Sequence, residues 1–314
     1  MSAVICIGEM LIDFIGSKKD SNLAEQDSFL MKPGGASANV ACVISSLGGS
    51  CYFYGSVGKD SFGDFLEKTL KQYNVQTQWL DRSDLPTTLA FVSVDTEGER
   101  DFMFYRGADA DVSMVNMKSL EDSNIQLFHF GAATGFLEGN LRFTYNELLH
   151  RAKKKGYFIS FDPNFRDAFW SEKSDVFRES CDEFLRLADL IKLSEEEAFL
   201  ISETNSEMEM ITYFRENYRG TFAVTLGSRG ALVFNDKWEM TIPAPKVKVV
   251  DTTGAGDAFI GALLFELSDK EKPQDLVKSQ KDMIKYVESA NKVASGICTE
   301  LGALSALKTK IDIQ

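Results

Sequence analysis

The run VDTTGAGDAF at residues 250–259 combines residue types that suit phosphate binding and phosphate chemistry. Backbone N–H groups at the start of a helix have no intrahelical partners, and the helix dipole adds positive charge there. Gly254 and Gly256 have no side chains that would keep an anion away from those groups. The carboxylate of Asp257 does not help to bind an anion, but it can take a proton from a hydroxyl that attacks phosphorus. The simpler alternative is an ordinary capped helix start, where Asp is common.

A second glycine turn, PGGASANVA at residues 33–41, also leads into a helical pattern. It is equally typical of a tight loop beside a closely packed helix and of the floor of a polar site, where Asn39 offers both a donor and an acceptor. Asp13 interrupts an apolar strand-like run. A carboxylate there either faces water at a sheet edge or accepts hydrogen bonds from hydroxyl groups in a cleft.

Polar residues follow three further strand-like segments. FDPNFR at 161–166 places its polar groups at the carboxyl end of a strand, where ligands bind in open α/β sheets. Arg166 could hold a phosphoryl group or a substrate oxygen, or it could cap the loop, with equal weight. TLGSRG at 225–230 resembles a turn between two strands and could contact a nucleotide. SEEE at 194–197 begins a helix, where negative charge is favourable in any case, although one glutamate could orient water around magnesium.

Composition and missing motifs exclude several classes of protein. The chain has 314 residues, of which 44% are apolar and 26% charged, as in globular proteins. Its net charge of −13 argues against nucleic acid or an anionic membrane as a partner. No run approaches the roughly 18 apolar residues of a spanning helix, and the start lacks the basic region of a signal peptide. The absence of G-x-x-x-x-G-K-[ST] excludes a P-loop enzyme, and the absence of G-x-G-x-x-G weakens a nicotinamide dehydrogenase reading.

The cysteine and histidine content also argues against several kinds of site. Five scattered cysteines without a C-x-x-C pair predict buried free thiols in a reducing cytoplasm. Only His129 and His150 are present, so a histidine metal site or a serine–histidine hydrolase is not expected, and both are interpreted as structural.

Strand-like and helix-like patterns alternate, which predicts a mostly parallel sheet covered by helices. Strands are expected at residues 4–7, 51–56, 127–130, 157–161, 190–192 and 222–225, and helices at 37–47, 60–73, 140–155, 175–187, 257–267 and 274–297. The last of these could be one long helix or two joined.

Two pairs of short extended segments break this alternation. Residues 11–15 pair with 29–31, and residues 88–94 pair with 100–105 through a hairpin signal at 95–99. They predict one small antiparallel sheet that covers a cleft, forms a dimer contact, or does both. No repeat or long linker occurs, so we expect a single domain over residues 1–314 with lid segments at about 11–32 and 87–106.

Together these motifs resemble the ribokinase/PfkB family of sugar kinases, and within it the bacterial fructokinases. Besides 250–259, the resemblance is carried by residues 8–9, 13, 34–39, 87–91, 104–106 and 162–166. It implies a Rossmann-like three-layer α/β/α sandwich with an antiparallel lid. It also implies ATP-dependent transfer of the γ-phosphoryl group to a ketohexose hydroxyl, with fructose at O6 as the first candidate. The implied enzyme is cytoplasmic, uses Mg²⁺, has a site that could bind K⁺, and could dimerise through its lid.

Two other functions stay open beside this one. The 2-keto-3-deoxygluconate kinases share several of these patterns, and Pro163 with residues 87–91 favours fructose over their substrate. Such a carboxylate-bearing substrate would need an extra cation in the sugar pocket, which Arg106 could supply. A catalytically inactive sugar sensor is the third possibility, and the intact Asp257 and glycines argue against it.

The resemblance also implies a role for individual residues. Asp257 would be the catalytic base, and the N–H groups of Ala255, Gly256 and Asp257, with Gly254 shaping the turn, would form the anion hole. The sugar would contact Asp13, Gly34, Gly35, Asn39, Phe104 and Asn164, with Arg106 and Arg166 reaching it or the phosphate. The nucleotide would contact Thr225, Gly227, Gly230, Lys192 and Asn291.

Two metal sites are implied in the same way. Glu197 would be associated with Mg²⁺, although Ser194 replaces the asparagine of the family's N-x-x-E motif. Asp251, Thr253 and Gly302 would bind a monovalent cation. Glu300 stands where relatives carry a basic residue, which is a departure from the family pattern near this cation site.

Overall fold

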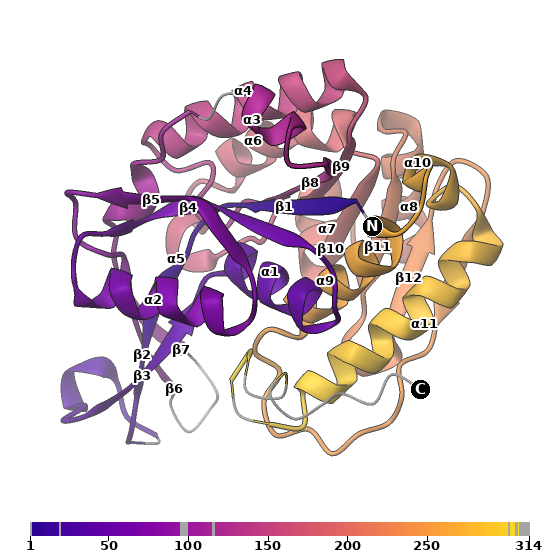
Figure 1. Ribbon diagram of the computed structural model, residues 1–314. Helices are drawn as coiled ribbons and strands as arrows, with labels where there is room; N and C mark the ends of the chain where they lie inside the picture. The colour runs from indigo at the N-terminus through magenta and orange to yellow at the C-terminus, as the bar shows by residue number, and fades with distance from the viewer. Residues whose placement is uncertain are drawn as a thin grey trace.

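Within the described residues, the chain folds around a nine-stranded sheet that carries helices on both faces (Figure 1). The computed structural model describes residues 2–18, 20–94, 100–114, 117–300, 302–304 and 307. The hairpin turn expected at residues 95–99 lies outside these ranges.

The large sheet has the strand order β13-β12-β11-β10-β9-β8-β1-β4-β5. Its strands are β1 (Ala3–Ile7), β4 (Cys51–Gly58), β5 (Gln76–Ser83), β8 (Ile125–Gly131), β9 (Phe158–Asp162), β10 (Leu190–Ser194), β11 (Thr221–Thr225), β12 (Ala231–Phe234) and β13 (Glu239–Ile242). The strands from β11 to β5 in this order run parallel, and β12 and β13 add an antiparallel edge. The chain leaves β1 first toward β4 and later returns to β8 on its other side. This reversal creates a switch point at the carboxyl ends of the strands, where ligands bind in such sheets.

The helices form two layers around this sheet (Figure 1). In chain order they are α1 (Ala36–Ser46), α2 (Ser61–Gln72), α3 (Met117–Glu121), α4 (Asn140–Lys155), α5 (Asp167–Trp170), α6 (Ser174–Leu187), α7 (Glu195–Ser202), α8 (Glu207–Asn217), α9 (Ala255–Ser268), α10 (Pro273–Leu276) and α11 (Gln280–Ile297). Residues 274–297 therefore form two helices, which was one of the two expected alternatives. A hydrophobic core lies against each face of the sheet. The core on one face includes residues of α1, α9 and α11, and the core on the other face includes residues of α4, α6 and α8.

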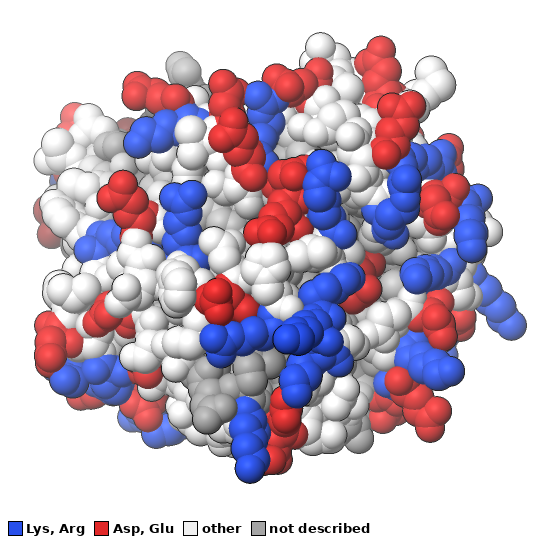
Figure 2. Space-filling view, turned by 90° about the horizontal axis from the view of Figure 1, so that it is seen from above, with Lys and Arg blue, Asp and Glu red and all other residues white. Residues whose placement is uncertain are grey.

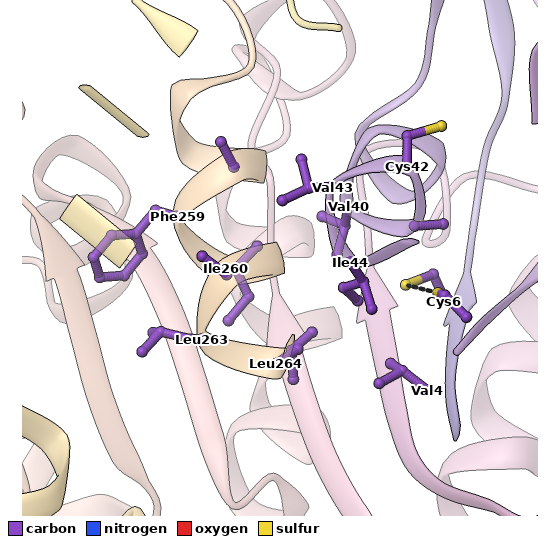
Figure 3. Packing of buried hydrophobic residues seen from close by; sticks show 14 of the residues in the cluster. Val4, Cys6, Val40, Cys42, Val43, Ile44, Phe259, Ile260, Leu263 and Leu264 are labelled. Atoms are coloured by element: carbon purple, nitrogen blue, oxygen red, sulfur yellow. Dashed lines mark hydrogen bonds between the residues drawn. The ribbon is translucent and has the colours of Figure 1, made fainter. Parts of the chain in front are cut away.

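The packing of α9 against α1 determines the position of the glycine run at residues 254–256. Figure 3 shows Val40, Val43 and Ile44 of α1 facing α9 above strand β1. Gly261 allows this approach, because a Cβ there would lie 2.8 Å from the Val43 side chain. Helix α9 is apolar around most of its surface, as expected of a helix buried between a sheet and neighbouring helices.

A second, smaller sheet is attached at one side of the molecule (Figure 1). Its strands are β2 (Leu11–Gly16), β3 (Phe29–Gly34), β6 (Leu89–Val94) and β7 (Arg100–Tyr105), in the order β3-β2-β6-β7. We call it the lid sheet. The pairs β2–β3 and β6–β7 are antiparallel as expected, and they are joined by a parallel β2–β6 pair that the sequence did not predict.

The surface carries mixed charge. Figure 2 shows acidic and basic side chains intermingled over one face of the molecule. No helix in the described part of the chain combines the length and apolar character needed to cross a lipid bilayer.

Candidate active site

The carboxyl ends of β9 and β10 and the start of α9 enclose a cavity of about 460 Å³. Its lining contains seven of the residues singled out from the sequence: Asn164, Arg166, Lys192, Glu197, Gly254, Gly256 and Asp257. These residues come from four separate sequence segments. The strand ends therefore bring polar groups together at the sheet edge where the strand patterns predicted them.

Asp257 is held at the cavity wall by the packing of α9 on α1. Its side chain is 8% exposed, and its Oδ2 accepts a hydrogen bond of 2.8 Å from Asn39 Nδ2. Burial raises the pKa of Asp257, and the hydrogen bond from Asn39 and the charges of Lys192 and Arg166 oppose that rise. The carboxylate is thus oriented by an amide and more basic than an exposed one.

The turn before α9 has the conformation that an anion site requires. Gly254 adopts a left-handed conformation with φ of 78°, and a Cβ there would lie 2.4 Å from the Ala303 Cβ. Ala255 N–H already donates to the Thr252 carbonyl at 3.2 Å. Gly256 and Asp257 occupy the next two positions, where a helix supplies no backbone partner for N–H groups. The anion hole expected from three N–H groups therefore rests mainly on these two.

Lys192 lies directly beside this helix start. Its side chain is buried, its Nζ is 3.1 Å from Asp162 Oδ2, and a Cβ on Gly256 would lie 3.0 Å from Nζ. Burial raises the pKa of Asp162 to about 7, although the charge of Lys192 acts in the opposite direction. The ion pair thus places a cation next to the candidate anion hole. Lys192 was expected to contact the nucleotide, and at this position it would lie near the phosphates.

The carboxylate of Glu197 accepts hydrogen bonds from the backbone of two different segments. Its Oε2 accepts the N–H of Ser194 and its Oε1 accepts the N–H of Phe165, both at 2.7 Å. The Ser194 hydroxyl accepts the N–H of Glu197 in return, which completes a capping box at the start of α7. The capping interpretation of SEEE is confirmed, and the same carboxylate fastens the loop after β9 to the end of β10.

The expected sugar residues of β2 and the second glycine turn pack on one another and are not part of the cavity lining given above. A Cβ on Gly34 would lie 2.1 Å from Asp13 Oδ2, so glycine is needed there for the carboxylate to take its place. Gly35 has φ of 105°, and a Cβ there would lie 2.5 Å from the Glu9 carbonyl. Burial raises the pKa of Asp13 to about 6. The charge of Arg166 lowers that pKa and the charge of Asp257 raises it. Asp13 of the lid therefore interacts electrostatically with two residues of the cavity lining.

Two residues expected at the sugar are engaged elsewhere. Arg106 Nε lies 3.1 Å from the buried Asp109 carboxylate, and its guanidinium also donates to the carbonyls of Glu138 and Thr134. Phe104 packs on Phe169 of α5. Neither residue is part of the cavity lining described above.

The expected nucleotide residues other than Lys192 lie around the turn from β11 to β12 and the end of β13. Thr225 ends β11, and Gly227 and Gly230 have φ of 57° and 99° in the turn that follows. A Cβ on Gly230 would lie 2.1 Å from the Ile242 carbonyl. Asn291 of α11 donates to the same carbonyl at 3.0 Å, so both residues also shape this part of the fold.

Comparison with known proteins identifies the family. A model of the pfkB family carbohydrate kinases matches residues 1–310. The chain belongs to this family. It is 36% identical over 312 residues to Fructokinase-2 of Zea mays, covering 98% of this chain and 91% of that protein.

Solved structures agree with this assignment. The fructokinase of Vibrio cholerae O395, bound to fructose, ADP and calcium ion, superposes with a TM-score of 0.85 at 31% identity, covering 98% of this chain and 96% of that one. A double mutant of that enzyme, bound to fructose, ADP and potassium ion, gives 0.84 at 30% identity, covering 98% and 95%. The kinase described here therefore has the ribokinase-like α/β fold.

The residues that could hold metal ions in this kinase fall into two groups. Asp251 Oδ1 accepts from the N–H and hydroxyl of Thr253, and Oδ2 accepts from the N–H of Gly302 at 2.8 Å, so the three expected cation residues lie together. No cluster of three His, Cys, Asp or Glu side chains suited to a metal occurs in the described part of the chain. Glu196 and Glu197 line the cavity and fit a Mg²⁺ ion that keeps most of its ligands as water and phosphate oxygens.

Glu9 is a buried carboxylate to which the analysis of single residues assigned no role. It is buried at the end of β1, and its Oε1 accepts the N–H of Ala36 at 2.7 Å where α1 begins. Its Oε2 has no hydrogen-bond partner among the described residues. Burial raises the pKa of Glu9 to about 7. The available signal was an acidic residue directly after an apolar strand, which appeared only within the family resemblance.

We expect Glu9→Gln to remove a pH dependence of folding stability from this kinase. The ordinary pKa of Glu9 is 4.5, so its folded state binds more protons than the unfolded state between about pH 4.5 and 7. Wild-type stability must therefore fall across that window as the pH rises, by up to about 3 kcal/mol for this group. Urea unfolding at pH 5, 6, 7 and 8 measures it, with the exposed Glu172→Gln as the control. Parallel pH curves for wild type and Glu9→Gln would contradict the expectation.

Proposed function

We propose that this kinase transfers the γ-phosphoryl group of ATP to O6 of fructose. The observation that carries the proposal is Asp257, oriented by Asn39 in one cavity with the N–H groups that start α9 and with Lys192. The similarity to fructokinases over almost the whole chain supports fructose as the acceptor.

The chemistry needs only positioning, charge stabilisation and one proton transfer. Fructose would lie against Asp13 of the lid sheet, whose carboxylate packs on the turn at Gly34 and Gly35. Asp257 would accept the proton of the attacking hydroxyl as its oxygen bonds to the γ-phosphorus. The bond from that phosphorus to the β-phosphate oxygen breaks, and ADP leaves. The raised pKa of Asp257 favours this role, because a more basic carboxylate is a better general base near neutral pH.

Charge on the transferring group would be stabilised by several elements of the cavity. These are the N–H groups of Gly256 and Asp257 at the start of α9, the ammonium of Lys192 beside them, and Arg166 at the cavity wall. Mg²⁺, held next to Glu196 and Glu197 by water and phosphate oxygens, would neutralise further charge. The nucleotide would extend from there toward Thr225, Gly227, Gly230 and Asn291.

The alternative substrate, 2-keto-3-deoxygluconate, is less well supported. Its carboxylate would need an additional cation in the sugar pocket, and the candidate for that role was Arg106. The ion pair of Arg106 with the buried Asp109 and its donation to two carbonyls occupy this guanidinium. Of the two arginines expected near the sugar or the phosphate, Arg166 lines the cavity, and its exposed position suits the phosphoryl group.

The proposal is tested by ADP release from Mg-ATP with purified protein. Fructose, 2-keto-3-deoxygluconate, ribose, glucose and no sugar are compared, each in potassium chloride and in tetramethylammonium chloride. Greatest turnover with fructose, and fructose 6-phosphate as the product in ¹³C NMR, is the expected result, with higher rates in potassium if the cluster around Asp251 binds that ion. Preference for the keto-deoxy acid would contradict the substrate, and no turnover with any sugar would contradict the activity.

We also propose that the lid sheet is a self-association surface. Met103 and Tyr105 are neighbouring apolar side chains on one face of the edge strand β7, and they are 41% and 55% exposed in the single chain. Exposed apolar groups at a sheet edge favour association with another sheet. Light scattering of the purified protein should give the mass of a dimer.

A further inference from the structure

Helix α5 presents one aromatic side chain to the lid sheet. The ring of Phe169 lies 4.5 Å from that of Phe104 and 5.9 Å from that of Phe102, centre to centre, at interplanar angles of 61° and 74°. Both distances and both angles fall in the range of favourable edge-to-face aromatic pairs. Phe169 therefore contacts strand β7 of the lid through two rings.

The face of the lid that Phe169 touches is the face that carries Asp13. Asp13 of β2 pairs with Ala90 of β6, and Ala90 pairs with Phe104 of β7. Side chains of directly opposed residues point to the same face of a sheet. Asp13 and Phe104 thus lie in one row across the lid, and a contact that holds Phe104 also holds the row that contains the carboxylate.

The other end of this contact is anchored to the cavity. Arg166 immediately precedes α5, and Phe165 and Trp170 pack on Phe177 of α6 with ring centres 5.0 and 5.4 Å away. Glu197 holds the N–H of Phe165. Phe169 is therefore mounted on a short helix whose position is fixed from the main domain.

We propose that Phe169 is a positioning residue that holds the inner face of the lid, and with it Asp13, over the cavity. This inference rests on the proposed function and assigns Phe169 a role in sugar binding and in the exclusion of water. Without its ring, the lid loses the contacts of Phe102 and Phe104 with α5. Asp13 is then less often in place for the sugar, and water reaches the phosphoryl group more easily.

The kinetic test compares Phe169→Ala with Phe169→Tyr, which keeps the ring, and with Phe143→Ala. Phe143 lies on α4 and is 64% exposed, so it is a matched loss of a phenyl group outside the lid contact. For Phe169→Ala we expect KM for fructose to rise about tenfold, the scale of one to two aromatic contacts, with a smaller change in kcat. Sugar-independent ADP release should rise relative to turnover. Phe169→Tyr and Phe143→Ala should resemble wild type.

These readouts separate positioning from a general loss of structure. A merely destabilised protein has fewer active molecules, which lowers kcat but leaves KM for fructose unchanged. The proposal is overturned if KM for fructose in Phe169→Ala stays within about twofold of wild type, which is below the effect of a single aromatic pair. It is also overturned if Phe169→Tyr behaves like Phe169→Ala.

Hydrogen exchange without ligands tests the contact independently of the substrate. Peptides that cover β6 and β7 should exchange faster in Phe169→Ala than in wild type, and at the wild-type rate in Phe143→Ala. If wild type fails to phosphorylate fructose, the proposed function is wrong, and the exchange rates still decide whether Phe169 holds the lid. Unchanged exchange in Phe169→Ala would overturn the proposal even if fructose is the substrate.

Discussion

Asp257→Asn is expected to lower kcat by about 10³-fold or more, the combined cost of losing the general base and misplacing the nucleophile. An amide cannot accept the hydroxyl proton. If its one oxygen accepts the Asn39 hydrogen bond, as Oδ2 of Asp257 does, an NH2 group takes the place of the second carboxylate oxygen and misplaces the sugar hydroxyl. Calorimetric titration with an ATP analogue should give a Kd close to that of wild type, because the N–H groups at the start of α9 remain.

A matched control is available in the same cavity. Asp167 also lines it, at the first position of α5, and Asp167→Asn makes the same change of charge and size. That variant should keep most of the activity. Wild-type kcat should fall with decreasing pH as the raised pKa of Asp257 is crossed, and the residual activity of Asp257→Asn should lack this dependence. A kcat near wild type in Asp257→Asn would contradict the role of base.

The second large effect is expected for Lys192→Met. It removes the cation beside the candidate anion hole, and we expect a loss in kcat of about 10²–10³-fold, the scale seen when one stabilising group is removed from a transition state. It also leaves Asp162 buried without its ion-pair partner. Breaking a buried pair in this way costs about 3–5 kcal/mol of folding stability when the remaining group is charged.

The pH dependence of this loss follows from the pKa of Asp162. That pKa is already raised to about 7 and must rise further without Lys192. The folded variant then binds a proton that the unfolded chain does not, so its stability falls as the pH rises. Urea unfolding should therefore show a larger loss at pH 8 than at pH 6.

The double variant Lys192→Met with Asp162→Asn separates the two roles of the lysine. It has no uncompensated charge, and the Oδ1 of Asn can still accept the N–H of Asn164 as Asp162 does. We expect it to recover most of the stability and little of the activity. Recovery of kcat in the double variant would mean that Lys192 serves only to balance Asp162.

The elements that carry the site could be predicted because their signals are local. The helix expected over residues 60–73 is α2, which begins after Asp60, and the Asp60 side chain caps it by accepting the N–H of Gly63. The buried strands β1, β9 and β10 appear as short apolar runs, and polar residues follow each of them. Strand β5 and helix α8 were missed, since their sequences mix polar and apolar residues without a clear period.

The glycines of the site could also be interpreted from the sequence, but only in part. Gly254 was expected to shape the turn before α9, and its positive φ agrees with that expectation. The donation of the Ala255 N–H to Thr252 was not expected, because it depends on how tightly this turn closes. The parallel β2–β6 pairing was missed for a related reason: the pairing of two hairpins is decided by the surface on which both pack.

The sequence by itself determined the alternation of strands and helices, the residue types at the strand ends and the glycine turn before α9, because backbone conformation and capping depend on near neighbours. Only the tertiary structure decided which polar groups meet. Asn39 and Asp257 are 218 positions apart and share a hydrogen bond because α1 packs on α9. Arg106 donates to the carbonyl of Thr134, 28 positions away, beside its ion pair with Asp109. Phe169 reaches the lid because α5 is fixed on α6. Contacts of this kind depend on long-range packing, which no spacing along the chain encodes.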